Sequence, residues 1–202
     1  MKSVLVKFTF LLSFLYTYAV AGDADIQLVS KLFTQKSDQI MTIVSNKKLD
    51  KATRNTQIIE TVDPMFDFML MGKLSLGKTV WRSLTKEKKE AFTKLYVERM
   101  KNSYSKKVDI YTDEKINITS AIKEKKDRIK LVTSLVGNSG NTEVIYKFHK
   151  TKKPIEGKET WLVYDAIIVG VSIIKTDRSQ FKEVLQSGTI DTLMEKMQAS
   201  KN

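Results

Sequence analysis

Apolar residues recur every three or four positions along the chain after residue 21, and this spacing predicts amphipathic helices. Between residues 26 and 44 they form one stripe, with lysines and polar residues between them. A second helix is predicted from about residue 50 to residue 62, where Asp63 and Pro64 interrupt it. We expect Asp63 to cap a new helical turn and Pro64 to occupy its first position.

The next segment, residues 65–71, is apolar nearly all the way round. A helix without a polar face is either fully buried or lines something apolar. The longest predicted helix follows at residues 85–108, with Thr85 as its cap. Its apolar stripe is one-sided, and it comprises Phe92, Leu95, Tyr96, Met100, Ser103 and Tyr104.

The hydrophobic period then changes to two, which predicts strands. Apolar alternation runs through residues 116–122, 129–135, 144–148 and 161–172, with turn residues between the runs. Consecutive strands joined by short loops pair antiparallel. The last run is interpreted as strand, bend and strand with Gly170 at the bend, after which Asp177 caps a short helix and a final helix covers residues 190–197. The predicted fold is therefore α+β, an antiparallel β-meander covered by several amphipathic helices.

The first 21 residues have the pattern of a secretory signal peptide. Lys2 and Lys7 precede or flank an apolar block, and Ala19-Val20-Ala21 forms a small-residue cleavage site. Residues 22–202 are then expected to form one exported domain. They contain no cysteine, so we expect packing alone to stabilise this domain.

The chain is basic, with a formal net charge of +12. Removing Lys2 and Lys7 with the signal peptide lowers it to +10, because residues 1–21 contain no acid. This charge favours anionic partners, or it simply decorates a solvated surface. No nucleic-acid recognition motif is present, so nucleic acid is not an expected partner.

One motif points to a different function. Residues 72–79 match the P-loop pattern, with Gly72, Gly77, Lys78 and Thr79 at the required positions. A P-loop needs a buried strand directly before its first glycine, whereas the residues before Gly72 are predicted to be helical. We therefore reject an ATPase.

The residues offer little for catalysis or metal binding. His149 is the one histidine of the sequence and is expected to be a surface imidazole among lysines. Asp67 and Asp165 are expected to accept hydrogen bonds from backbone or tyrosine donors. A small enzyme that uses Asp165 with His149 stays an alternative, and it requires the two side chains to be close. We expect no catalysed reaction, no metal and no cofactor.

Large apolar side chains are unusually frequent: Phe66, Phe68, Met69, Trp81, Phe92, Tyr96, Tyr104, Tyr146 and Trp161. They either fill a core or form the wall of a cavity between helices and sheet. Sequence periodicity does not separate these two possibilities.

Two motif blocks carry a resemblance to a known family. The first contains Phe66-Asp67-Phe68, Leu76-Gly77, Trp81, Phe92 and Tyr104. The second contains Trp161, Val163-Tyr164-Asp165, Gly170-Val171-Ser172 and Arg178 to Phe181. Together they resemble the periplasmic lipid-binding proteins of the maintenance-of-lipid-asymmetry (Mla) pathway, also called the toluene-tolerance family. The chain departs from the family pattern at Lys88, Val169 and Asp177.

The resemblance implies a periplasmic, monomeric carrier with a lipid pocket between helices and a curved sheet. It implies that the carrier shuttles phospholipid, and so helps maintain outer-membrane lipid asymmetry. Its implied partners are an outer-membrane lipoprotein/porin complex and an inner-membrane ABC transporter complex. The alternative is a periplasmic adaptor that binds a protein partner and contains only a packed core.

Burying acyl chain is worth about 0.8 kcal/mol per methylene, so a carrier for two chains needs a deep pocket. We expect a volume at or above the upper end of the roughly 300 to 1,000 Å³ usual for ligand pockets. The predicted lipid-binding residues come from both layers: Phe66, Phe68, Met69, Trp81, Phe92, Tyr96, Tyr104, Tyr146, Trp161, Val163, Val169, Val171 and Ile173. A one-residue register error would exchange the two faces of a strand.

Overall fold

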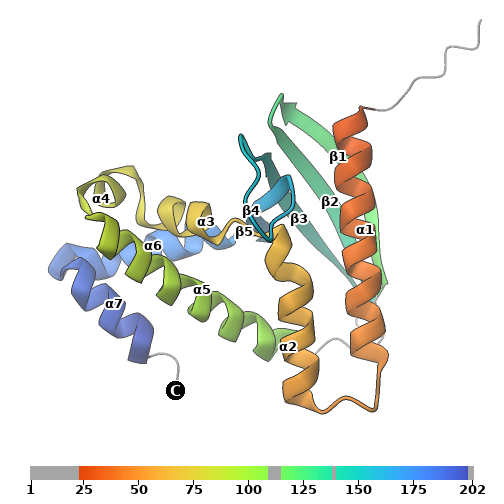
Figure 1. Cartoon of the computed structure of the whole chain (residues 1–202), viewed down its shortest axis with the longest axis horizontal. Coiled ribbons are helices and arrows are strands. Elements are labelled where there is room, and N and C mark those ends of the chain that lie inside the picture. The colour runs from red at the N-terminus through yellow and green to blue at the C-terminus, as the bar shows by residue number, and fades with distance from the viewer. Residues whose placement is uncertain (1–22, 109–114, 138–139, 200–202) are drawn as a thin grey trace, which may run out of the picture.

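The computed structural model describes residues 23–108, 115–137 and 140–199, so the predicted signal peptide lies outside the described part. Figure 1 shows one group of helices beside the sheet and a second group next to it. The helices are α1 (Ala24–Ser45), α2 (Lys51–Val62), the 3₁₀ turn η1 (Asp63–Met65), α3 (Phe68–Leu76), α4 (Lys78–Ser83), α5 (Lys86–Val108), α6 (Ile173–Ser187) and α7 (Ile190–Ala199). The strands are β1 (Lys115–Lys125), β2 (Arg128–Gly137), β3 (Gly140–Lys150), β4 (Trp161–Ile168) and β5 (Val171–Ser172).

The strands form a single antiparallel sheet in the order β1-β2-β3-β4-β5. This is the predicted meander, and the predicted α+β class is confirmed. Helix α1 lies along the sheet, and α2 runs back beside α1 (Figure 1). None of the described helices is long and apolar enough to span a lipid bilayer.

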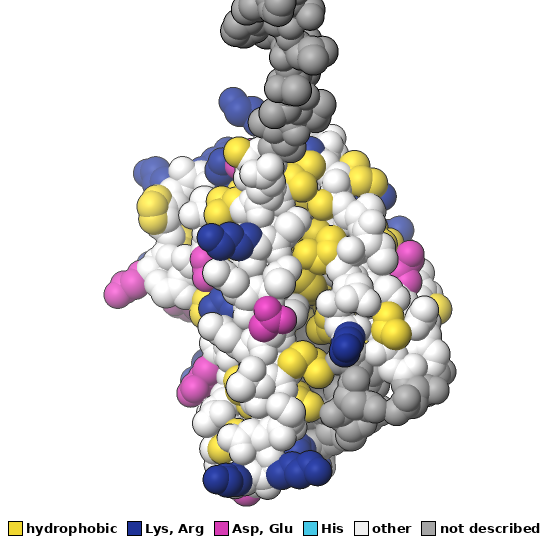
Figure 2. Space-filling view, turned by 90° about the vertical axis from the view of Figure 1, so that its right-hand side faces the viewer, with side chains coloured by type: hydrophobic (Ala, Val, Ile, Leu, Met, Phe, Trp, Pro, Cys, Tyr) yellow, Lys and Arg dark blue, Asp and Glu magenta, His cyan; other side chains and the backbone are white. Residues whose placement is uncertain are grey.

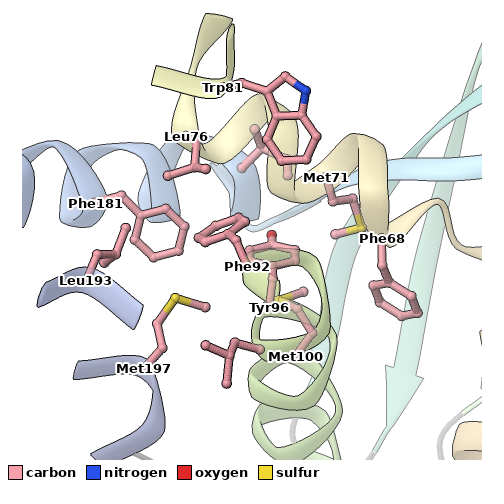
Figure 3. Packing of buried hydrophobic residues seen from close by; sticks show 12 residues of the cluster. Phe68, Met71, Leu76, Trp81, Phe92, Tyr96, Met100, Phe181, Leu193 and Met197 are labelled. Carbon is pink, nitrogen blue, oxygen red and sulfur yellow. The ribbon is translucent and has the colours of Figure 1, made fainter. Parts of the chain in front are cut away.

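The described residues form two hydrophobic cores. The first, the helical core, joins α3 to α7 and is drawn in Figure 3. Phe92 and Phe181 pack edge to face there, with ring centroids 5.9 Å apart. Gly72 lets α3 approach α5 closely, because a Cβ at this position would lie 3.2 Å from the ring of Phe92. The second, the sheet core, joins α1 and η1 to the sheet through residues such as Val29 and Phe148.

The helical segment after Pro64 begins later than predicted. Asp67, not Asp63, caps α3, since its Oδ1 accepts from the backbone N–H of Leu70 at 2.8 Å. Phe66 is extended and forms a bridge with Val163 of β4. The residues before Gly72 are helical, as predicted, so the strand that a P-loop requires is absent from this described segment.

Helix α6 begins earlier than predicted. Ser172 caps it, because its hydroxyl accepts from the backbone N–H of Lys175 at 3.1 Å. The predicted cap, Asp177, lies inside the helix and is buried. Its carboxylate accepts from the Tyr96 hydroxyl at 2.8 Å and from Arg99 at 2.7 Å, so it joins α6 to α5 instead. Ile173 was predicted on a strand, and it is the first residue of this helix.

Of the register shifts between the described strands, two β-bulges change which residues face the core. In β1 the extra residue is Thr119, whose hydroxyl donates to the carbonyl of Val132 at 3.1 Å. The predicted alternation is therefore wrong after Thr119: Ala121 is half-buried, whereas Ile122 is 45% exposed. A bulge adds one residue and so reverses the alternation beyond it.

The second bulge is at Tyr164 in β4. Val163 lies opposite Phe148, but the neighbouring pair is Asp165 with Lys147. Beyond the bulge, Ala166 takes the side of the sheet that Val163 takes before it. The strand then turns at Val169 and Gly170, which both have positive φ angles, 48° and 78°.

Candidate functional site

An apolar cavity of about 230 Å³ lies between the sheet and the pair α1 and α2. Its wall comes from three sources: the inner faces of α1 and α2, the turn η1 with the residues after it, and one face of strands β1 to β4. The lining residues are Phe33, Lys36, Ser37, Ile40, Met41, Val44, Ile58, Ile59, Val62, Asp63, Met65, Phe66, Phe68, Lys101, Ile116, Thr133, Leu135, Val144, Tyr146, Val163, Ala166 and Ile168.

Helix α1 presents its apolar stripe to this cavity. Phe33, Ser37 and Met41 recur at intervals of four, so they lie on one face of the helix. Asp23 caps the helix by accepting from the backbone N–H of Asp25 at 2.9 Å. Figure 2 shows the face of the molecule formed by α1 and the adjoining sheet edge, on which hydrophobic side chains gather in a stripe.

An ion-pair network holds the start of α1 against the sheet. Lys123 of β1 pairs with both Asp23 and Asp25 at 2.9 Å, and Lys150 of β3 pairs with Asp25 at 2.9 Å. Hydrogen bonds from Lys123, then from Lys150, lower the pKa of Asp25 from 3.8 to about 2. The network therefore fixes the first turn of α1 against the sheet, beside the ends of β1 and β3 that carry Lys123 and Lys150.

The floor of the cavity is apolar although one polar residue belongs to it. Thr133 is 1% exposed, and its hydroxyl donates to the carbonyl of Val144 at 2.8 Å. Its polar atom is thus satisfied within the sheet. The ring of Tyr146 packs on Phe33 of α1, with centroids 4.8 Å apart, so the two layers touch at this point.

Charged side chains lie at one part of the wall. Asp63 pairs with Lys101 at 2.7 Å and with Lys158 at 2.6 Å. Burial acts to raise the pKa of Asp63, but the hydrogen bonds from the two lysines outweigh it and keep that pKa below 3.8. This cluster joins η1 to α5 and to the segment between β3 and β4.

His149 is not the surface imidazole that was expected. Its side chain is 12% exposed, and its Nε2 lies 2.9 Å from Oδ2 of Asp67. Burial acts to raise the pKa of Asp67, but His149 and the backbone N–H of Leu70 outweigh it and lower that pKa below 3.8. The pair links β3 to the start of α3, which single-sequence spacing could not reveal.

Asp165 satisfies local donors, as predicted. Its carboxylate accepts from the hydroxyl of Ser172 at 2.8 Å and from the backbone N–H of Ile174 at 3.2 Å. Asp165 and His149 therefore bond to different partners, and their hydrogen bonds do not join them as a catalytic pair. Among the described residues, no group of three or more His, Cys, Asp or Glu side chains is placed to hold a metal ion.

Four of the predicted lipid-binding residues line the cavity: Phe66, Phe68, Tyr146 and Val163. The structure brings Trp81, Phe92 and Tyr96 into the helical core instead, and Ile173 packs against it. Figure 3 shows Phe92, Tyr96 and Phe181 grouped together, whereas Phe68 points away from that group. The reason is that α5 packs on α3 and α6, while α1 and α2 cover the sheet.

The remaining predicted residues also lie away from the cavity. Met69, Val169 and Val171 are 59%, 70% and 60% exposed. Beyond the Tyr164 bulge the odd-numbered positions of β4 leave the cavity side, so extending the alternation from Val163 to Val169 and Val171 was wrong. Trp161 is buried in the sheet core and lines a separate groove. The side chain of Tyr104 lies outside the described residues.

Sequence reasoning missed the contribution of α1 and α2. Phe33, Ile40 and Ile58 all line the cavity, and their helical periodicity was recognised as a packing stripe. That periodicity indicates which face is buried, but not which layer or which hollow it covers. The cavity is also smaller than expected, because side chains such as Phe33 and Tyr146 meet across it.

The second hollow is a groove of about 670 Å³ on the other side of α1. It lies between α1 and residues 159–161, and Lys36 lines both the groove and the cavity. The groove is lined by Leu28, Lys31, Leu32, Gln35, Lys36, Asp38, Gln39, Glu159, Thr160 and Trp161. An apolar cavity thus adjoins a polar groove.

Comparison with known proteins points to one family. Residues 34–199 match the family model described as MlaC protein. A curated relative from Haemophilus influenzae, the "intermembrane phospholipid transport system binding protein MlaC", is 27% identical over 179 residues, which cover 88% of this chain and 75% of the relative. A solved structure from Ralstonia solanacearum, described as a phospholipid-binding protein in complex with a phospholipid, is similar with a TM-score of 0.71. The match covers 85% of this chain and 95% of that one at 14% identity, so it shows a shared fold.

Proposed function

The chain belongs to the MlaC protein family, whose model spans residues 34–199, and we propose that it is a phospholipid-binding carrier of an intermembrane transport system. The observation that carries the proposal is the apolar cavity between the sheet and helices α1 and α2. A surface cavity lined by aliphatic and aromatic side chains suits acyl chains, because their burial removes apolar surface from water. The cavity also argues against an adaptor that contains only a packed core.

The proposal assigns the acyl chains to the cavity wall. Phe33, Ile40 and Val163 would contact the chains, together with Phe66 and Tyr146. The volume of about 230 Å³ lies below the roughly 300 to 1,000 Å³ of typical ligand pockets. Two full acyl chains therefore require α1 and α2 to move away from the sheet.

The remaining parts of the proposal concern the cell. We propose that residues 1–21 export the protein to the periplasm, where it exchanges phospholipid with outer-membrane and inner-membrane Mla complexes. The name of the Haemophilus influenzae relative supports this role in intermembrane transport. No reaction and no cofactor are part of the proposal, in which the bound lipid is cargo.

The test is the lipid content of the purified protein. The full-length chain is expressed in a Gram-negative host, purified from the periplasm without detergent, and analysed by native mass spectrometry and by lipid extraction. We expect one phospholipid per protein molecule. A well-folded protein without any lipid, which also fails to take up phospholipid from vesicles, would contradict the proposal.

A further inference from the structure

The groove and the cavity lie on two sides of α1, and the helical spacing decides which α1 side chains line each of them. Successive residues of an α-helix are about 100° apart around the axis. Lys31, Gln35 and Gln39 are spaced by four and form a stripe on the groove side, whereas Phe33 and Met41 face the cavity. A polar stripe and an apolar stripe therefore run side by side along the same helix.

Lys36 lies where these stripes meet and lines both hollows. Ser37, the next residue, lies on the cavity stripe between Phe33 and Met41. The side chain of Ser37 is buried, at 7% exposure, and it makes no hydrogen bond with any described residue. Its hydroxyl is therefore an unused donor in the cavity wall, one residue from Lys36.

A second unused donor belongs to a residue that lines the groove. Trp161 lines it and is 1% exposed, and its Nε1 has no hydrogen-bond partner among the described residues. A buried indole N–H without a partner is unfavourable in an empty site.

The two lysines of the groove are not held by strong ion pairs with other described residues, so they can contact a ligand. Lys31 is exposed and forms no ion pair with a described residue. Lys36 is 3.9 Å from Glu159, a long and partly exposed contact that contributes little. Asp38 and Glu159 also line the groove, and Glu159 competes with an anion for Lys36.

We propose that this boundary binds the glycerophosphate part of a diacyl phospholipid. The phosphate lies in the groove on Lys31 and Lys36, an ester carbonyl accepts a hydrogen bond from Ser37, and the acyl chains enter the cavity. The anionic group then lies in the groove and the hydrocarbon in the apolar cavity, with Lys36 and Ser37 as neighbours between the two parts of the lipid. This inference rests on the proposed function and adds to it a site for the headgroup.

The first experiment compares two probes that share their chains. The binding of phosphatidylglycerol and of diacylglycerol, each carrying the same fluorescent acyl chain, is measured with the full exported protein after removal of bound lipid. The wild-type protein is expected to bind phosphatidylglycerol more tightly. Lys36→Gln should weaken this binding about fivefold, since a charge-assisted hydrogen bond is lost, and should leave diacylglycerol binding unchanged.

Glu159→Gln should act in the opposite direction. It removes the competing carboxylate and should tighten phosphatidylglycerol binding, while Lys48→Gln is the control that removes one positive charge from the exposed turn between α1 and α2. Equal effects of Lys36→Gln and Lys48→Gln would overturn the proposal, because only a general charge effect would remain. Inorganic phosphate in excess should not displace phosphatidylglycerol; displacement would identify a free-phosphate site and overturn the assignment to a lipid headgroup.

The second experiment isolates the ester contact. Ser37→Ala should weaken binding of a diester phosphatidylglycerol about fivefold, but it should not change binding of the corresponding diether lipid, which has no carbonyl. An equal loss for both lipids would overturn the role of Ser37. If the wild-type protein binds neither phosphatidylglycerol nor diacylglycerol, the proposed function fails; if it binds both equally well, only the headgroup site fails.

Discussion

At the scale of single residues, Val163 and Val171 show which side of the last two strands faces the cavity. It is fully buried and lines the cavity, whereas Val171 was expected to share that wall and is 60% exposed. The difference arises because the Tyr164 bulge and the turn at Gly170 lie between them. A matched pair of substitutions can therefore test the cavity face.

Replacing Val163 by Trp should reduce phospholipid uptake strongly, because the indole would occupy the cavity. We expect at least about half of the bound lipid to be lost, and about 1 to 3 kcal/mol of the free energy of unfolding from overpacking. The measurements are lipid content by mass spectrometry and urea unfolding. Val171→Trp is the control, and it should change neither quantity; a loss of lipid with Val171→Trp alone would place the binding face on the other side of the strand.

The turn between β4 and β5 offers a test of backbone strain. Val169 and Gly170 both have positive φ, as in a type I′ hairpin turn, and Val is β-branched and poorly suited to that region. Asn suits it better, and the Val169 side chain is 70% exposed, so little burial is lost. Val169→Asn should raise the free energy of unfolding by about 1 kcal/mol in urea titrations. A decrease would show that this side chain makes a contact that stabilises the fold.

At the scale of elements, the ion pairs of Asp25 should determine how firmly α1 is held to the sheet. The pKa of Asp25 in the folded state is lowered to about 2. The ionised carboxylate therefore stabilises the folded state above pH 3.8, and this stabilisation is lost as the pH falls from 3.8 toward 2. Asp25→Asn should increase amide hydrogen exchange in the first turns of α1 at neutral pH. Asp38→Asn changes an exposed acid of the same helix and should not; equal exchange in both variants would contradict the role of the network.

The elements themselves were largely predictable, because apolar residues recur at the helical period in some segments and at the strand period in others. The predicted boundaries and faces that were wrong have physical causes that the apolar pattern does not record. At α6, Ser172 competes successfully with Asp177 for the cap, and Asp177 is used by Tyr96 and Arg99 instead. In β1 and β4 a bulge adds one residue to the strand, and period-two alternation carries no signal of such an insertion.

The cavity was predictable in kind but not in composition. Phe66, Phe68, Tyr146 and Val163 were placed in its wall, yet Phe92 and Tyr96 were assigned to it and belong to the helical core. A wide aromatic stripe shows that a helix is buried on one side. It does not show which neighbour covers that side, because that depends on contacts between elements far apart in sequence.

At the scale of the whole molecule, His149 and Asp67 connect the sheet to the helical part. The Asp67 pKa is depressed in the folded state, so its contribution to stability is present above 3.8 and lost as the pH falls below that value. His149→Gln should therefore lower the free energy of unfolding by about 1 to 3 kcal/mol near pH 5. The difference from the wild type should shrink below pH 3.8, which urea titrations across pH would measure.

Lys152→Gln serves as the control for this pH series, since it removes a basic, exposed side chain close to His149 in sequence. It should give the wild-type pH dependence. A His149→Gln difference that is constant across the pH range would show that the ring acts through packing and not through the Asp67 carboxylate.

The division of the hydrophobic interior into two cores bears on the stability of the protein while no lipid is bound. The helical core contains Phe92, Tyr96 and Phe181 and contributes Phe68 to the cavity wall, while most of that wall belongs to α1, α2 and the sheet. Emptying the site would therefore loosen one layer and leave the aromatic cluster of the other packed. We expect an unloaded molecule to keep the helical core as a folded platform for the layer of α1 and α2, and so to stay folded without its cargo.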